Sequence, residues 1–229
     1  LCNLDLGSDV LFEGNELCTN YQNCVENIDI GEQFNFNNCD DSINCDENND
    51  VELWGNCYNI EETDSIFLEP QTIDYIDYIS YEGLINEIPP QINKLVNLKS
   101  LIINNQSYLT GQLPSEIIEL VNLETLFIIE TQLSGEIPPE IGNLTNLTHL
   151  NLGGNLFTGE IPSEIGNLTN LEYLVLYGNQ LTGEIPSEIG NLTNLTILGL
   201  SGNQHTGEIP SEIGNLSNLE EIYLGNNQL

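Results

Sequence analysis

Residues 134–157 read SGEIPPEIGNLTNLTHLNLGGNLF, and three near-copies follow: TGEIPSEIGNLTNLEYLVLYGNQL at 158–181, TGEIPSEIGNLTNLTILGLSGNQH at 182–205 and TGEIPSEIGNLSNLEEIYLGNNQL at 206–229. A single copy cannot bury its own apolar face, so it becomes stable only by stacking on the next copy. The constant period therefore predicts a solenoid.

Within one copy the pattern predicts a strand, a turn and an extended return. From Leu171 to Leu176 apolar residues recur mostly at period two, which is typical of a short strand with one buried face. Strands of successive coils should pair into a parallel sheet. After each strand comes an asparagine whose amide can satisfy the turning backbone, at Asn155, Asn179, Asn203 and Asn227. A recurring proline favours extended or 3₁₀ backbone on the far side, at Pro114, Pro138, Pro162, Pro186 and Pro210.

The frame LxxLxLxxNxLTGxIPxxIGxL resembles the plant-type leucine-rich repeat of receptor-kinase ectodomains and polygalacturonase-inhibiting proteins, over about residues 84–229. The resemblance implies an α/β solenoid: a curved, twisted stack of coils with the parallel β-sheet on its concave face and a second short strand near TGxIP. It also implies binding of proteins, peptides or glycans rather than catalysis.

The first coils depart from this frame. The spacing from Pro89 to Pro114 is one residue longer than the later proline spacings, and the extra residue, within 104–108, predicts a surface bulge. Thr131 stands where later copies have asparagine, so the asparagine ladder should begin at Asn155. We therefore expect a solenoid at 63–229, irregular to about residue 112, preceded by a separate region at 1–62.

Region 1–62 should cap the open end of the solenoid. LWGNCYNI, around Trp54 and Cys57, resembles the end of the plant-type N-terminal cap, whereas the other cysteine spacings depart from it. All six cysteines lie here, and their even number predicts disulfides and an oxidising compartment: Cys2, Cys18, Cys24, Cys39, Cys45 and Cys57. Their pairing stays open. A zinc site is the competing interpretation, but this region contains no CxxC pair and no histidine.

The chain begins at Leu1 without a methionine or signal peptide, as in a mature secreted protein or a fragment. No apolar run approaches the length of a membrane span. The last coil ends at Leu229 with no closing cap, so either the natural sequence continues or the open end stacks on another molecule. We expect a secreted or cell-surface chain.

The chain carries 36 acidic residues against two lysines and no arginine, for a net charge of -34. Such a charge excludes nucleic acid as a ligand. The glutamates form two rows with neighbours about 5 Å apart: Glu136, Glu160, Glu184 and Glu208, and then Glu140, Glu164, Glu188 and Glu212. Saline surroundings or divalent cations would relieve their repulsion. The alternative is a solvated acidic face.

Asp46, Asn48, Asp50 and Glu52 place oxygen ligands at alternate positions and are a calcium candidate. Val51 occupies the position where an EF-hand loop needs glycine, so a solvated acidic loop is the alternative. We predict no other cofactor.

The sequence offers little for catalysis. His149 should face outward from a strand, and His205 replaces the apolar residue found as Leu181 one coil earlier. Neither has a nucleophile beside it in the repeat frame, and an array that is identical in every coil is a scaffold feature. We predict that the chain is not an enzyme.

Outward strand positions vary between copies and predict a ligand-binding surface on the concave face. The candidates are Phe127, Ile129, His149, Asn151, Tyr173, Val175, Tyr177, Ile197 and Tyr223. The ligand could be a protein, a peptide or a glycan, since tyrosines also stack on sugar rings. The alternative is free variation among strand-forming residues.

Seven N-x-S/T triplets are acceptors for N-glycosylation in a eukaryotic secretory pathway, at Asn105, Asn143, Asn146, Asn167, Asn191, Asn194 and Asn215. The same segments form regular hydroxyl rows, which suit the ordering of water, and ice binding is a further hypothesis. Two main functions remain. One is an extracellular recognition module that binds through the concave face. The other is a structural or adhesive protein whose repeats stack end to end into a filament.

Overall fold

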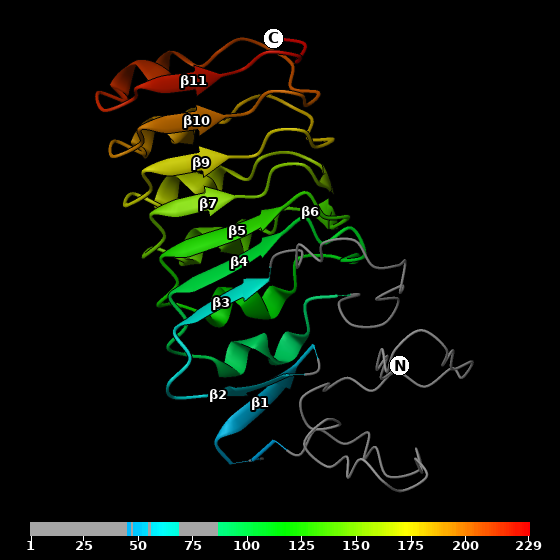
Figure 1. The fold of residues 1–229 in the computed structure, drawn as a ribbon. Helices are drawn as coiled ribbons and strands as arrows, with labels where there is room; N and C mark the ends of the chain where they lie inside the picture. The colour runs from blue at the N-terminus through cyan, green and yellow to red at the C-terminus, as the bar shows by residue number, and fades with distance from the viewer. Residues whose placement is uncertain (1–44, 47, 55, 69–86) are drawn as a thin grey trace, which may run out of the picture.

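The computed structural model describes residues 45–46, 48–54, 56–68 and 87–229. Coils stack along a solenoid with strands on one side and 3₁₀ helices on the other (Figure 1). The strands form a seven-stranded parallel sheet, in which each coil contributes one strand. Its strands are β3 (Ser65–Leu68), β4 (Ser100–Asn104), β5 (Thr125–Ile129), β7 (His149–Asn151), β9 (Tyr173–Val175), β10 (Ile197–Gly199) and β11 (Glu221–Tyr223). The predicted leucine-rich repeat solenoid is confirmed.

Each 3₁₀ helix follows a proline with extended backbone, as at Pro162 with φ -65° and ψ 139°. The ring fixes φ and removes a donor, so the chain enters the helix from an extended segment. The helices are η2 (Pro90–Lys94), η3 (Ser115–Glu119), η4 (Pro139–Asn143), η5 (Ser163–Asn167), η6 (Ser187–Asn191) and η7 (Ser211–Asn215). The prediction of extended and 3₁₀ backbone is confirmed.

A second, shorter parallel pairing runs beside the TGxIP segments. Here β6 (Ser134–Glu136) pairs with β8 (Leu156–Thr158). Isolated bridges from Glu160 to Thr182 and from Thr206 to Gln228 continue the pairing in later coils. The second strand implied by the resemblance is therefore present.

The asparagine ladder lies inside the turns that follow the strands. The Asn179 Nδ2 donates to the Leu152 carbonyl at 2.9 Å and to the Leu176 carbonyl at 3.1 Å, and its Oδ1 accepts from the Phe157 N–H at 3.0 Å. Asn203 makes the same contacts one coil later. At the start of the ladder, the Thr131 N–H and hydroxyl both donate to Asn155 Oδ1. The predicted start of the ladder at Asn155 is confirmed.

A hairpin of β1 (Asp50–Leu53) and β2 (Asn56–Asn59) lies at the N-terminal end of the solenoid. Val51 and Leu53 are buried in the common core, and Trp54 Nε1 donates to the Glu87 carbonyl at 2.9 Å. A disulfide joins Cys45 to Cys57. The hairpin thus covers the first coil as a cap would. Cys2, Cys18, Cys24 and Cys39 lie outside the described residues.

His205 occupies a core position and is fully buried, as expected from its place in the repeat. Its Nδ1 lies 3.4 Å from the Gly183 carbonyl, whereas its Nε2 has no hydrogen-bond partner. Burial lowers the pKa of His205 below its ordinary value of 6.5. The imidazole is therefore held neutral, at the cost of one unsatisfied polar atom.

We expect His205→Leu to raise the free energy of unfolding by about 1–2 kcal/mol at neutral pH, because leucine fills this position one coil earlier without an orphaned nitrogen. The folded-state pKa is depressed, so the unfolded chain binds the proton first as the pH falls below about 6.5. The parent protein should lose stability there and the variant should not. Urea unfolding from about pH 8 to about pH 5 checks this. If the difference in free energy of unfolding between the variant and the parent does not grow as the pH falls, the buried imidazole is not neutral.

Candidate functional site

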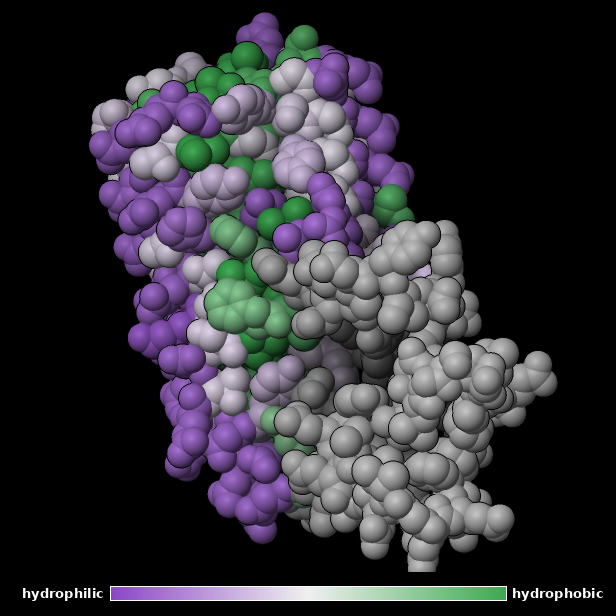
Figure 2. Space-filling model, viewed as in Figure 1, coloured by the Kyte–Doolittle hydropathy of each residue, from purple (hydrophilic) through white to green (hydrophobic). Residues whose placement is uncertain are grey.

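The outward side chains of the seven-stranded sheet form a surface that we call the sheet face. Cα register aligns them in columns across the strands, so that Thr125, His149, Tyr173, Ile197 and Glu221 are successive neighbours. Apolar residues follow the strands down the middle of the view, between hydrophilic margins (Figure 2). The predicted candidates are therefore neighbours in space.

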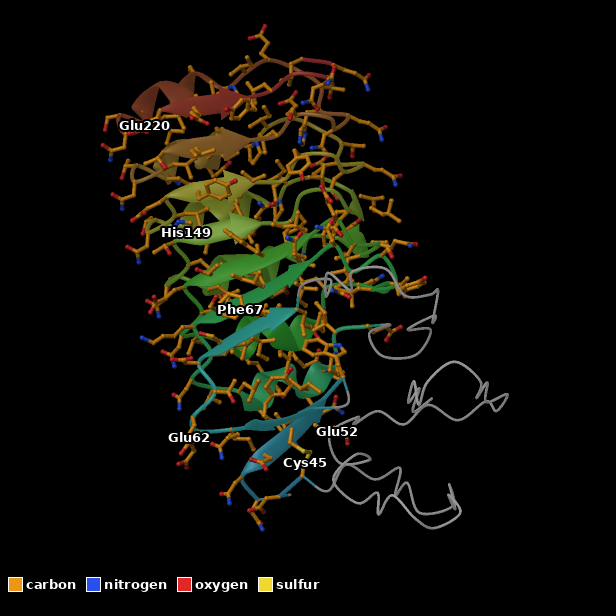
Figure 3. All side chains as sticks on the ribbon, in the orientation of Figure 1. Cys45, Glu52, Glu62, Phe67, His149 and Glu220 are labelled. Carbon is orange, nitrogen blue, oxygen red and sulfur yellow. A yellow bond between two sulfur atoms is a disulfide. The ribbon has the colours of Figure 1, made fainter. Side chains whose placement is uncertain are left out.

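Three rings on adjacent strands form an aromatic cluster. His149 stacks on Tyr173 with centroids 6.0 Å apart and planes 24° apart, and Phe127 lies 6.3 Å from His149 and 6.0 Å from Tyr173. All three side chains are half-buried, so part of each ring faces solvent. Phe67, on β3, is 62% exposed and shares the sheet face with His149 (Figure 3). This cluster is the most developed contact surface among the described residues.

Two of the predicted candidates are covered rather than exposed. Asn151 and Val175 each keep only 6% of their surface accessible, so neither presents an exposed side chain to a ligand. Side chains on the same face of a sheet lie close to their neighbours along the strand and across it, and these neighbours can cover them. Val175 lies between Tyr173 and Tyr177 along the chain, and the Asn151 Oδ1 accepts from the Gly153 N–H at 2.9 Å. Asn151 therefore shapes the backbone of its own turn.

The remaining candidates lie around the cluster. Ile129 and Ile197 are half-buried, whereas Tyr223 is 52% exposed and its hydroxyl donates to Glu221 at 2.7 Å. That hydrogen bond raises the pKa of Tyr223. Tyr177 lies over Gly153, where an added Cβ would come within 2.3 Å of the ring. Burial, helped by the nearby Glu130, raises the pKa of Tyr177.

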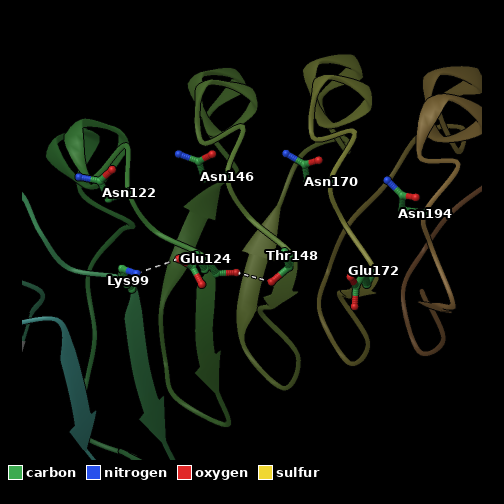
Figure 4. Close-up of a pocket in the computed structure, with 8 residues that line it drawn as sticks. All are labelled: Lys99, Asn122, Glu124, Asn146, Thr148, Asn170, Glu172 and Asn194. Carbon is green, nitrogen blue, oxygen red and sulfur yellow. Dashed lines mark hydrogen bonds and ion pairs between the residues drawn. The ribbon is translucent and has the colours of Figure 1, made fainter.

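A groove runs along the edge of the sheet where the strands begin, and we call it the edge groove (Figure 4). Its volume is about 480 Å³. Lys99, Asn122, Glu124, Asn146, Thr148, Asn170, Glu172 and Asn194 line it. Lys99 Nζ lies 3.4 Å from Glu124 Oε1, and both side chains are more than half exposed. The Thr148 hydroxyl contacts His149 Nδ1 at 2.9 Å, which joins the groove to the aromatic cluster.

One wall of the groove is a second, exposed asparagine ladder. In each coil an asparagine Nδ2 donates to a backbone carbonyl of the preceding coil, as Asn146 does to Val121 at 2.7 Å and Asn170 to Thr145 at 2.9 Å. Neither this ladder nor the opposite wall was predicted from the sequence. The sequence did carry a signal for both walls. The asparagine row comes just before the leucine that precedes each strand, and the row of the opposite wall comes just after it, once per repeat.

The calcium candidate spans the turn that leads into β1 and the first residues of β1 itself. Asp46 accepts from the Asn48 N–H at 3.1 Å and from Asn49 Nδ2 at 2.7 Å, and the backbone donor lowers the pKa of Asp46. Asp50 accepts from Asn59 Nδ2 at 3.3 Å, and Glu52 is exposed on the strand. Within 45–46, 48–54, 56–68 and 87–229 no three His, Cys, Asp or Glu residues are grouped to hold a metal ion.

All seven predicted glycosylation acceptors are exposed. Asn143, Asn167, Asn191 and Asn215 end the 3₁₀ helices η4 to η7. Asn105 has φ 53°, in the predicted bulge. Asn146 and Asn194 belong to the exposed ladder. The two glutamate rows are exposed as well, and serine hydroxyls donate to the second row, as Ser163 does to Glu164.

Comparison with protein families decides the assignment. The model of the leucine-rich repeat region matches residues 86–177 and 140–228, which is more than half of the sequence. This chain belongs to the leucine-rich repeat family. The comparison with curated proteins gives no significant match. In the part of this leucine-rich repeat chain that the structure describes, no helix is long and apolar enough to span a membrane.

Several solved structures are similar to this leucine-rich repeat protein. The ectodomain of the Arabidopsis thaliana receptor kinase GASSHO1/SCHENGEN3, in complex with CASPARIAN STRIP INTEGRITY FACTOR 2, is 45% identical, covers 62% of this chain and 17% of its own, and has a TM-score of 0.61. The Arabidopsis receptor kinase HAESA, in complex with the peptide hormone IDA and the co-receptor SERK1, is 43% identical. The match covers 62% of this chain and 24% of HAESA, with a TM-score of 0.61. A plant ice-binding protein is 33% identical, and the match covers 63% of this chain and 54% of that protein, with a TM-score of 0.59. The chain thus spans about a fifth of each receptor ectodomain.

Proposed function

We propose that this leucine-rich repeat protein is an extracellular, non-enzymatic recognition module that binds a peptide or a protein segment on its sheet face. The observation that carries the proposal is the aromatic cluster of Phe127, His149 and Tyr173, which is partly exposed on three adjacent strands. Aromatic side chains of this kind dominate binding energy at protein interfaces. The remaining surface is acidic and regular, and offers no comparable anchor among the described residues.

The similar receptor structures support a peptide over other ligands. Two of them were solved with a peptide hormone or a factor bound, and they are 45% and 43% identical to this chain. The GASSHO1/SCHENGEN3 structure is the ectodomain of a plant membrane receptor kinase, which supports an extracellular location. Glycan binding and end-to-end stacking have no comparable support.

We expect that linear peptides selected from a random phage-displayed library against the intact protein will depend on the aromatic cluster. Combined Phe127→Ala and Tyr173→Ala should weaken the selected peptides at least about thirtyfold, because truncating a hot-spot aromatic typically costs about 2 kcal/mol or more. Val121→Ala removes an exposed apolar side chain away from the sheet face and is the matched control. Thermal unfolding of each variant checks that folding is intact. Selected peptides that bind the double variant as well as the parent would contradict the proposal.

Ice binding is a second candidate, favoured by the similar plant ice-binding protein and by exposed hydroxyl rows. Thr145, Thr169, Thr193 and Ser217 recur once per coil, all exposed, at the strand spacing of about 4.8 Å. Thermal hysteresis and inhibition of ice recrystallisation by the purified chain test it. If this function holds, Thr169→Lys and Thr193→Lys should abolish activity, whereas changes to Phe127 should not.

A further inference from the structure

A row of residues that alternates between near-identical coils begins in the edge groove. The residue after the leucine that precedes each strand is Lys99, Glu124, Thr148, Glu172, Thr196 and Glu220 in successive coils. The first four line the groove. Thr196 and Glu220 continue the row beyond that lining, and the Glu220 N–H donates to the Thr196 carbonyl at 2.8 Å. By contrast, the two outer glutamate rows repeat in every coil. The row therefore places carboxylates two coils apart rather than one.

The hydroxyl groups of the threonines between the carboxylates already donate hydrogen bonds within the fold. The Thr148 hydroxyl donates to the Glu124 carbonyl at 3.0 Å, and the Thr196 hydroxyl donates to the Glu172 carbonyl at 2.8 Å. They line the row without adding charge. Lys99 neutralises Glu124 from the adjacent coil, which shows that a carboxylate of this row can receive an ammonium group within the groove. Glu172 and Glu220 have no cationic partner among the described residues and are exposed.

The spacing of these two carboxylates selects a ligand conformation. Strands in a sheet lie about 4.8 Å apart, so side chains two coils apart are separated by about 9.6 Å. A polyproline II helix rises about 3.1 Å per residue with three residues per turn, so its residues i and i+3 share a face about 9.3 Å apart. In a β-strand, residues i and i+3 point to opposite faces. The row therefore matches a polyproline II ligand with a basic residue at every third position.

The sheet side of the groove provides the apolar half of such a site. Thr148 lines the groove and contacts His149, whose ring stacks on Tyr173, so the aromatic cluster lies beside the groove. Proline-rich segments dock on aromatic-lined surfaces because their extended conformation is preformed and loses little entropy on binding. The net charge of -34 favours a cationic partner at long range.

We propose that the edge groove, the row that continues from it to Glu220 and the aromatic cluster together bind a basic, proline-rich peptide in the polyproline II conformation, with lysine or arginine at every third position paired to Glu172 and Glu220. The inference rests on the proposed function and specifies its ligand class. The prolines of the peptide lie against His149 and Tyr173. The asparagine amides of the groove wall lie beside the peptide backbone, which has no internal hydrogen bonds.

A synthetic peptide of repeated Lys-Pro-Pro triplets is the probe, measured by fluorescence anisotropy with the intact protein at about 50 mM salt, where charge contacts are weakly screened. A peptide of the same composition with its lysines clustered at one end controls for net charge. We expect the period-three peptide to bind at least about tenfold more tightly than the clustered one, because only its charges match the row.

Two double variants with the same charge change test the assignment on the protein. Glu172→Gln with Glu220→Gln should weaken the period-three peptide at least about tenfold. Glu164→Gln with Glu212→Gln removes two exposed carboxylates, also two coils apart, on the helix side, and should weaken it less than about threefold. Equal affinity for the two peptides, or equal losses of affinity in the two double variants, would overturn the inference. Either result would show that net charge attracts the peptide and that the spacing of the row does not matter. If library peptides still require Phe127 and Tyr173 in that case, the proposed function stands and only the ligand class is wrong.

Discussion

Asn179→Ala should lower the free energy of unfolding by about 3 kcal/mol, because it removes the internal ladder from one coil. The Phe157 N–H loses its acceptor, and the Leu152 and Leu176 carbonyls each lose a donor. A buried polar group left unsatisfied costs about 1–3 kcal/mol, and the truncation also leaves a cavity. Urea unfolding followed by far-UV circular dichroism measures the loss.

Asn170→Ala is the matched control for this prediction. Asn170 belongs to the exposed ladder of the edge groove and donates one hydrogen bond, to the Thr145 carbonyl at 2.9 Å. Water can replace an exposed donor, so we expect a loss of about 1 kcal/mol or less. Equal losses in Asn179→Ala and Asn170→Ala would show that burial does not decide the value of these asparagines.

Gly166→Ala should be strongly destabilising, because the helices of adjacent coils touch at this glycine. A Cβ on Gly166 would lie 2.5 Å from the Glu188 carbonyl oxygen and 2.7 Å from the Glu188 Cβ. The first of these atoms is backbone, so the coil itself must shift. Overpacking of this kind typically costs about 1–3 kcal/mol, and we expect a loss in the upper half of that range. The shift would also change the coil spacing on which the edge groove depends.

Gly214→Ala tests the same position without the neighbour. Gly214 lies in η7, the equivalent helix of the last coil, and an added Cβ would meet no atom within 4 Å. Alanine is more favourable than glycine within a helix by about 0.5–1 kcal/mol, so we expect an unchanged or slightly higher stability. Thermal unfolding of the two variants side by side should therefore give shifts of opposite sign or very different size. Similar losses would exclude coil contact as the reason for this glycine.

The aromatic cluster and the edge groove suggest how a regular scaffold acquires a distinct surface. The repeat keeps leucine, asparagine, proline and glycine constant, because each has a place in the core, the ladder or the turn. Most variation falls at the strand positions and in the row beside them, with exceptions such as His205 in the core. The proposed binding surface therefore lies on one side of the coil, where Glu172 lines the edge groove and Tyr173 follows it in the sequence.

The sequence alone predicted the solenoid, the parallel sheet, the internal ladder from Asn155 and the core position of His205. It did so because the period determines which residues share a row, and each row has one chemical role in every coil. The departures were equally readable, since Thr131 interrupts the ladder at the residue where the amide is missing. These predictions depend on spacing along the chain.

Only the tertiary structure decided what adjacent rows do to one another. The burial of Asn151 and Val175, the rings stacked at His149 and the groove beside Thr148 depend on contacts between rows. The Cys45–Cys57 disulfide likewise required the β1–β2 hairpin to bring the two residues together, because six cysteines allow many pairings. The repeat period specifies the alignment of side chains along the solenoid, but the size and direction of each side chain decide which neighbours it covers.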